Sequence, residues 1–88
     1  MSDPRYIRHD YRSIVGHLVE ECGEVCAAAG KTLRWGPDST DPTIPPEKRE
    51  TNEDWLMREV RDLEEVIARL RSYISHNTPA RRVEEWQE

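Results

Sequence analysis

Two pairs of acidic residues have a spacing that could place both carboxylates of each pair on one side of a helix. Glu21 and Glu24 are three residues apart, and Glu59 and Asp62 repeat this spacing further along the chain. Residues three or four apart are neighbours on a helix surface. Four carboxylates with no thiolate and no required imidazole suit a hard divalent cation such as Mg²⁺ or Mn²⁺. The four acids therefore predict a metal site.

The apolar residues around these acids recur at helical spacing and indicate which acids face a core. At about 100° per residue from Ile14, the first apolar arc spans roughly 0° to 140°, and Glu21 borders it at roughly 340°. Measured from Trp55, Glu59 lies at roughly 40°, inside the second apolar arc. With 18 acids among 88 residues, acid pairs three apart also arise by chance on solvated faces. A carboxylate inside an apolar stripe is costly unless it is paired, protonated or bound to a metal, which favours a functional role.

The first of these acid pairs lies on a helix predicted from about residue 10 to residue 33. Gly36-Pro37 should end that element, because glycine permits the turn and proline cannot continue a helix. Residues 36–50 contain four prolines and several acids, and they read as a surface loop that is longer than most connectors. Its length suggests either function or flexibility.

The second acid pair lies on a helix capped by Thr51 or Asn52 and extending to about Ile74. Thr78 and Pro79 should then begin a short third helix over residues 80–87. No β pattern is visible. The predicted fold class is therefore all-α, a helical hairpin with a short third helix, and its facing apolar stripes would bring the two acid pairs together.

Length and composition favour one small domain, residues 1–88, that associates with further copies of itself. Hydrophobic and charged residues each make up 35% of the chain, which is lean for a self-sufficient core. The net charge of −5 argues against a nucleic-acid backbone binder. We expect no membrane span and a cytoplasmic protein, since the apolar runs are short. Cys22 and Cys26, four apart, are predicted to be small core residues.

The acid motifs together resemble those of the MazG-like all-α nucleoside triphosphate pyrophosphohydrolases. That family carries Glu-x-x-Glu on one helix and Glu-x-x-Asp on the next, matched here by Glu21-Cys22-Gly23-Glu24 and Glu59-Val60-Arg61-Asp62. The segment Lys31-Thr32-Leu33-Arg34-Trp35-Gly36 is similar to the end of the first motif helix in relatives. The similarity covers roughly residues 14–74.

This resemblance implies Mg²⁺-dependent hydrolysis of ribo- or deoxyribonucleoside triphosphates to the monophosphate and pyrophosphate. Glu21, Glu24, Glu59 and Asp62 would be the catalytic, metal-holding residues, and the cation would bridge phosphate oxygens and lower the pKa of the attacking water. Lys31, Arg34 and Trp35 would contact the substrate. The resemblance also implies a four-helix-bundle-like oligomer, a homodimer or homotetramer.

Several alternatives stay open at the level of sequence. Glu20 and Glu65 are both possible general bases. Trp35 could stack on a base or cover the open end of the hairpin, and His17 could be a ligand or a boundary residue. The chain could instead be a non-catalytic helical dimerisation or regulatory module that retains a metal–nucleotide site, or it could act on another nucleotide pyrophosphate such as a phosphoribosyl-ATP intermediate.

Overall fold

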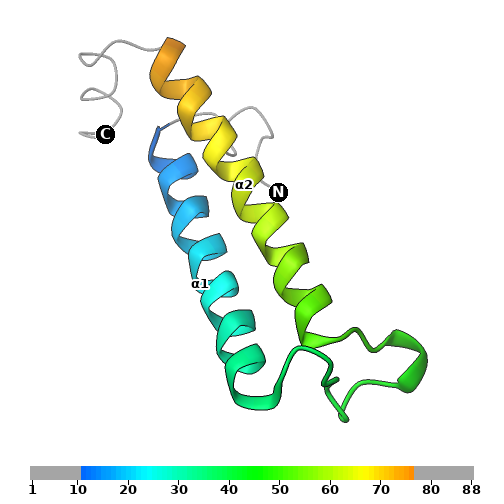
Figure 1. Ribbon diagram of the computed structural model, residues 1–88. Coiled ribbons are helices and arrows are strands. Elements are labelled where there is room, and N and C mark those ends of the chain that lie inside the picture. The colour runs from blue at the N-terminus through cyan, green and yellow to red at the C-terminus, as the bar shows by residue number, and fades with distance from the viewer. Residues whose placement is uncertain (1–10, 77–88) are drawn as a thin grey trace.

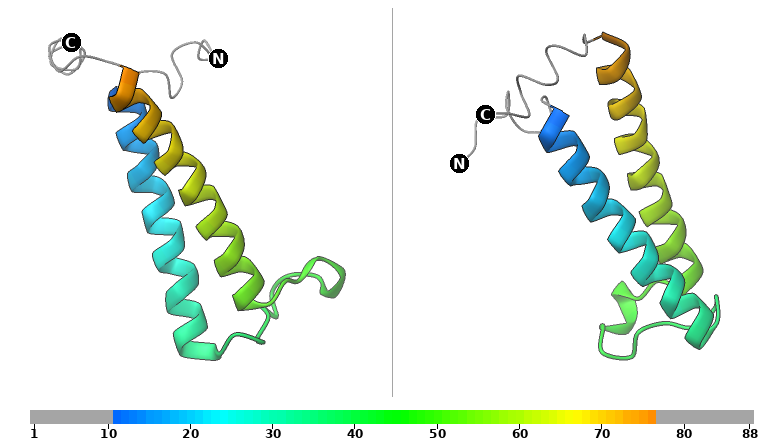
Figure 2. Two further views of the ribbon diagram at one scale, coloured as in Figure 1. Left: turned by 45° about the horizontal axis from the view of Figure 1, so that its top comes forward. Right: turned by 90° about the vertical axis from the view of Figure 1, so that its left-hand side faces the viewer.

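The computed structural model of the protein describes residues 11–76, which form a hairpin of two long helices (Figure 1). Helix α1 spans Tyr11–Trp35 and helix α2 spans Asn52–His76, each 25 residues long. A single 3₁₀ turn, η1, covers Pro46–Lys48 in the connecting loop. The helices lie side by side in three views, and the loop projects from one end (Figures 1 and 2). The prediction of a helical hairpin is confirmed for these residues, whereas the predicted third helix lies outside them.

The two helices bury one residue in every seven along the face where they meet. The buried positions are Ile14, Glu21 and Ala28 on α1, and Asn52, Glu59, Val66 and Tyr73 on α2. A seven-residue repeat is the spacing at which paired helices keep one seam together. At the open end of the hairpin, the rings of Tyr11 and Tyr73 stack with their centroids 5.8 Å apart. Two glutamates therefore occupy central seam positions that hydrophobic side chains would normally fill.

The C-terminus of α1 is closed by Gly36 and by a side chain from α2. Gly36 has a φ of 93°, a left-handed conformation that glycine adopts without strain, and its N–H donates to the Thr32 carbonyl at 2.9 Å. The buried Asn52 amide donates to the Gly36 carbonyl at 3.0 Å and to the Lys31 carbonyl at 3.4 Å. The prediction that Gly36 ends the first helix is confirmed, two residues beyond the expected boundary.

The N-terminus of α2 is capped by Thr51 and by carbonyl groups of the loop. The Thr51 hydroxyl accepts a hydrogen bond from the Asp54 N–H at 3.1 Å, as the sequence predicted for a helix cap. The N–H groups of Asn52 and Glu53 donate to the carbonyls of Ser39 and Pro37 at 2.8 and 2.9 Å. The start of α2 is thus tied to the chain that leaves α1, which fixes the offset of one helix along the other.

Internal hydrogen bonds hold the loop between the helices in a defined shape. Arg49 donates from Nε to the Ile44 carbonyl at 2.6 Å and from Nη2 to the Pro42 carbonyl at 3.0 Å. The Asp41 carboxylate accepts hydrogen bonds from both the backbone and the hydroxyl of Thr43, at 2.9 and 2.7 Å. The loop therefore forms an ordered structure beside the ends of the helices.

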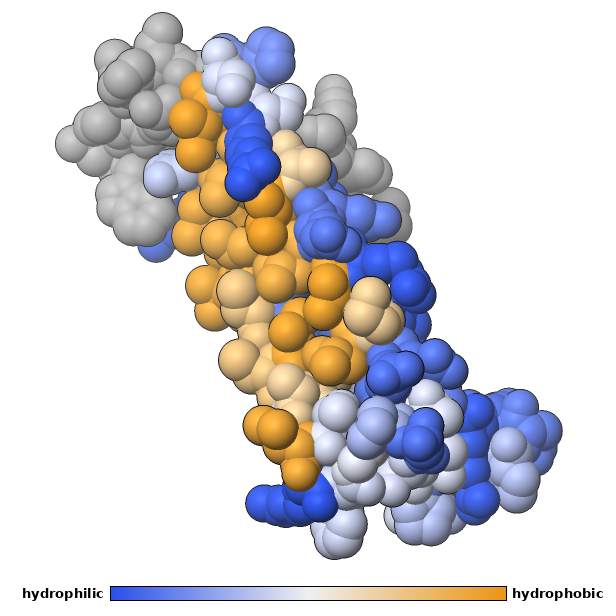
Figure 3. Space-filling model, viewed as in Figure 1, coloured by the Kyte–Doolittle hydropathy of each residue, from blue (hydrophilic) through white to orange (hydrophobic). Residues whose placement is uncertain are grey.

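An apolar band runs along both helices on the face shown in Figure 3. Several large apolar side chains of α1 and α2 are exposed, including Val19 at 66% and Ile74 at 45%.

Cys22 and Cys26 are free thiols and are also exposed, so the prediction that they belong to the core is wrong. They lie about 80° and 120° around α1 from Ile14, whereas the seam runs through Ile14, Glu21 and Ala28 at one edge of the apolar arc. Among residues 11–76, neither helix combines the length and apolar character that crossing a membrane requires.

Candidate metal centre

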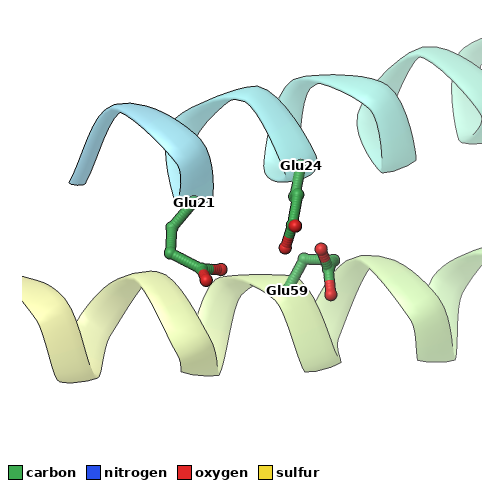
Figure 4. A group of neighbouring side chains, drawn as sticks. All are labelled: Glu21, Glu24 and Glu59. Carbon is green, nitrogen blue, oxygen red and sulfur yellow. The ribbon is translucent and has the colours of Figure 1, made fainter. Parts of the chain in front are cut away.

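Three of the four predicted acids meet between the helices at the middle of the hairpin. Glu21 and Glu24 project from α1 towards Glu59, which projects from α2 (Figure 4). Each offers one carboxylate oxygen, and these three oxygens lie within 4.8 Å of one another. We call these residues the acid cluster. The three-residue spacing on α1 and the antiparallel packing bring them together, as the sequence predicted.

The acid cluster extends from the buried seam to the surface. Glu59 is 4% exposed and Glu21 is 9% exposed, whereas Glu24 is exposed to solvent. Glutamate is rarely buried to this extent without a partner, because removing a carboxylate from water is costly. The cluster therefore has two carboxylates fixed by packing and a third that solvent can reach.

The environment of Glu59 opposes its ionised form. Burial raises the pKa of the Glu59 carboxyl, and a hydrogen bond and like charge from Glu24 raise it further. Arg58 acts in the opposite direction and lowers this pKa, since its Nη1 lies 3.0 Å from Glu59 Oε1. Together these effects raise the pKa of Glu59 above its ordinary value. Carboxylates that lie close together repel one another, and this repulsion raises a pKa. A bound divalent cation would remove the repulsion.

A chain of hydrogen bonds from α2 orients the carboxylate of Glu21. Arg69 Nη2 lies 2.7 Å from His17 Nδ1, and His17 Nε2 lies 3.1 Å from Glu21 Oε1. Arginine can only donate a hydrogen bond, so His17 Nδ1 is the acceptor. The ring proton is then on Nε2, which donates a hydrogen bond to Glu21 Oε1. Glu21 Oε2 is buried and has no hydrogen-bond partner among residues 11–76. A buried carboxylate oxygen that accepts no hydrogen bond lowers the stability of the fold. A cation bound to this oxygen would compensate for the missing donor.

Asp62, the fourth predicted acid, lies one turn from Glu59 on α2 and is half-buried. Its oxygens are not part of the acid cluster. Its charge nevertheless contributes to the raised pKa of Glu59. Asp62 is thus near the cluster, and its role as a metal ligand stays a prediction.

A cavity of about 630 Å³ lies between the loop and the adjoining ends of the helices. We call it the loop pocket. Lys31 and Trp35 line it from α1, Trp55 and Arg58 from α2, and Glu50 from the loop. Of the three residues predicted to contact substrate, Lys31 and Trp35 therefore reach this pocket, while the exposed Arg34 is not among its lining residues.

Arg58 and Asn52 are two residues of this region whose roles the sequence did not reveal. Arg58 joins Glu59 to the loop residue Glu50, and Asn52 closes the end of α1. An arginine beside an acid in a charged helix reads as an ordinary surface residue, and an asparagine at a helix start reads as a cap. The two possible general bases, Glu20 and Glu65, are both exposed, and neither belongs to the acid cluster.

Comparisons of the chain with known protein families, with curated proteins and with solved structures found no match in any of the three.

Proposed function

We propose that the protein is a metal-dependent nucleoside triphosphate pyrophosphohydrolase of the MazG-like kind. The observation that carries this proposal is the acid cluster: three carboxylates from two helices within 4.8 Å, two of them buried. A small hairpin gains no stability from crowded carboxylates in its seam, so the arrangement calls for a ligand of opposite charge. The sequence motifs that contain these acids resemble those of enzymes that hydrolyse nucleoside triphosphates.

The donor set of the acid cluster fits a hard divalent cation. All three ligands are carboxylates, which favours Mg²⁺ or Mn²⁺ over softer metals. The partnerless Glu21 Oε2 offers a buried ligand atom, and exposed Glu24 leaves a side from which substrate can approach. A bound cation would supply positive charge for the phosphates and would acidify the attacking water. Asp62 would complete the set of four ligands.

The chain's own residues would bind and orient the substrate. Lys31, near the end of α1, would attract the polyphosphate, and Arg34 in the last turn would add to the positive charge. Trp35 would contact the base. The buried residues Glu21 and Glu59 are held by packing, so they would keep their positions while the substrate binds.

One assay tests this proposal directly. Ribo- and deoxyribonucleoside triphosphates are incubated with the full chain and Mg²⁺ or Mn²⁺, and pyrophosphate release is measured against a metal-free control. We expect the monophosphate and pyrophosphate as products. Release of orthophosphate and the diphosphate would show that the scissile bond had been assigned wrongly, and the absence of either product would contradict the proposed activity.

The second candidate function is a helical dimerisation or regulatory module that binds metal and nucleotide without turnover. The exposed apolar band along α1 and α2 favours self-association, which a dimerisation module requires (Figure 3). A second copy packed on this band would give a four-helix arrangement. Nucleotide binding that depends on metal but yields no pyrophosphate would support the module over the enzyme.

A further inference from the structure

The loop pocket and the acid cluster are joined by one side chain, Arg58, which lines the pocket and contacts Glu59. Its Nη2 lies 2.6 Å and its Nε 3.4 Å from the two oxygens of Glu50, which lines the pocket. Its Nη1 lies 3.0 Å from Glu59 Oε1 in the acid cluster. A ligand that occupies the pocket and extends along Arg58 therefore reaches the carboxylates.

Arg58 can bind an anion in this position. The guanidinium carries five N–H donors, and its contacts with Glu50 and Glu59 use three of them. The side chain is 48% exposed, so a ligand can approach the guanidinium from solvent. Lys31 lines the same pocket from α1 and supplies a second cation. Two cations from opposite helices can hold a phosphate group between them.

The remaining walls of the pocket suit a flat aromatic ring. Two indoles line it, Trp35 from the last turn of α1 and Trp55 from the first turn of α2. Trp35 is 62% exposed, although burying an indole would stabilise so small a hairpin. A base can stack on an aromatic side chain of this kind, because every base has a π-face. A volume of about 630 Å³ also falls within the usual range for small-molecule sites, about 300–1,000 Å³.

We propose that the loop pocket binds the heteroaromatic ring of a nucleotide against Trp35 and Trp55, while Arg58 and Lys31 hold a phosphate beside the acid cluster. This assignment rests on the proposed function and extends it, because it gives the loop at residues 37–50 the task of selecting the substrate. It also assigns Arg58, which the acid motifs do not include, as the cation that joins the pocket to the cluster.

Titration calorimetry with the four deoxynucleoside monophosphates, each with Mg²⁺, tests the proposal without depending on turnover. A monophosphate has no anhydride bond, so its binding reports the pocket alone. We expect saturable binding of at least one base. Arg58→Gln should weaken monophosphate binding about tenfold or more, since a hydrogen bond to a charged group contributes about 1.5–3 kcal/mol. It should weaken binding of the corresponding nucleoside much less.

Two further variants separate ring binding from phosphate binding. Trp35→Leu should weaken nucleoside and monophosphate by a similar factor of about ten, and it removes a side chain that is mostly exposed, so the hairpin should keep its helical circular dichroism. Arg61→Gln, on the solvent-exposed side of α2 and outside the pocket, is the matched control and should bind like the wild type.

The pyrophosphate assay on the same proteins distinguishes a failed pocket from a failed function. A wild type that releases pyrophosphate, with KM unchanged in Arg58→Gln and Trp35→Leu, would overturn the pocket and leave the proposed function standing. Monophosphate binding that both variants weaken, with no pyrophosphate from any triphosphate, would support the pocket and remove the enzymatic function. No saturable binding of any monophosphate or nucleoside to the wild type would overturn the pocket.

Discussion

At the scale of single residues, Glu59 has the strongest conflict between its position and its charge. Its pKa is raised mainly by burial and then by Glu24, with Arg58 opposing and Asp62 adding to the shift. A carboxyl whose pKa is higher in the folded state favours folding when it is protonated. Without metal, the contribution of Glu59 to stability should therefore be greatest below its unfolded pKa and should be lost as pH rises through its folded pKa.

The variant Glu59→Gln isolates this effect. Without metal it should melt at a higher temperature than the wild type at neutral pH, because the amide keeps the shape and removes the buried charge; each 1 kcal/mol corresponds to about 4–8 °C for a domain of this size. The difference should shrink as pH falls and Glu59 is protonated in the wild type. Comparing the two proteins cancels the other titrating groups, including the exposed Asp41, whose pKa is lowered by its hydrogen bonds from Thr43. A difference that does not change with pH would contradict the assignment.

Mg²⁺ or Mn²⁺ should reverse the order of these two proteins. A ligand that binds only the folded state raises the free energy of unfolding, by about 2.7 kcal/mol at a hundred times its Kd, and the melting temperature rises with it. The wild type should show this rise, and Glu59→Gln should lose most of it. Glu64→Gln, an exposed acid on the same helix, is the control. An equal metal-induced shift in Glu59→Gln would mean that the cation binds elsewhere.

His17 should affect metal binding at the proposed site by orienting Glu21. Removing the imidazole with His17→Ala takes away the donor at 3.1 Å from Glu21 Oε1 and the acceptor for Arg69. Loss of such an orienting partner typically costs about 10–100-fold in metal affinity. Calorimetric titration with Mn²⁺ measures this directly, and His76→Ala, at the exposed end of α2, is the control. An unchanged affinity would show that packing alone orients Glu21.

At the scale of the elements, the sequence was sufficient to predict both helices and the face that carries the acids. The 3.6-residue periodicity placed Glu59 inside an apolar arc, and Glu59 is buried in the structure. The same reasoning misplaced Cys22 and Cys26, because an apolar arc wider than one helix contact does not indicate which part of it faces the partner. The loop pocket could not be predicted, since it depends on side chain-to-backbone bonds such as those of Arg49.

Asn52 illustrates a contact between elements that local rules do not reveal. Its side chain joins the start of α2 to the end of α1 through the carbonyls of Gly36 and Lys31. Asn52→Ala should leave these carbonyls without their donor and destabilise the hairpin by about 1–3 kcal/mol. Thermal unfolding followed by circular dichroism measures the loss. Ser75→Ala, which removes an exposed side chain-to-backbone bond at 2.9 Å, should have a much smaller effect. Equal effects would mean that Asn52 contributes no more than a surface bond.

At the scale of the whole molecule, the hairpin buries little apolar surface and exposes much. Among residues 11–76, the buried hydrophobic residues are Ile14, Ala28, Val66 and Tyr73. Small domains with so few buried side chains usually need a metal, disulfides or another subunit to be stable. The two cysteines are free, so disulfides do not serve here. The acid cluster also weakens the centre of the seam, which increases the need for packing elsewhere.

The apolar band along α1 and α2 should therefore be the surface on which copies of the chain associate. Sedimentation at micromolar concentration should show a dimer or a larger assembly, and dilution should lower the melting temperature, because folding and association are then linked. Val19→Glu places a charge within the exposed apolar band and should shift the protein towards monomers that melt at lower temperature. Ser72→Glu, at an exposed position about 200° around α2 from the exposed apolar Ile74, should leave the assembly unchanged. A wild type that sediments as a single folded monomer, with a melting temperature independent of concentration, would show that the band does not bind a second copy.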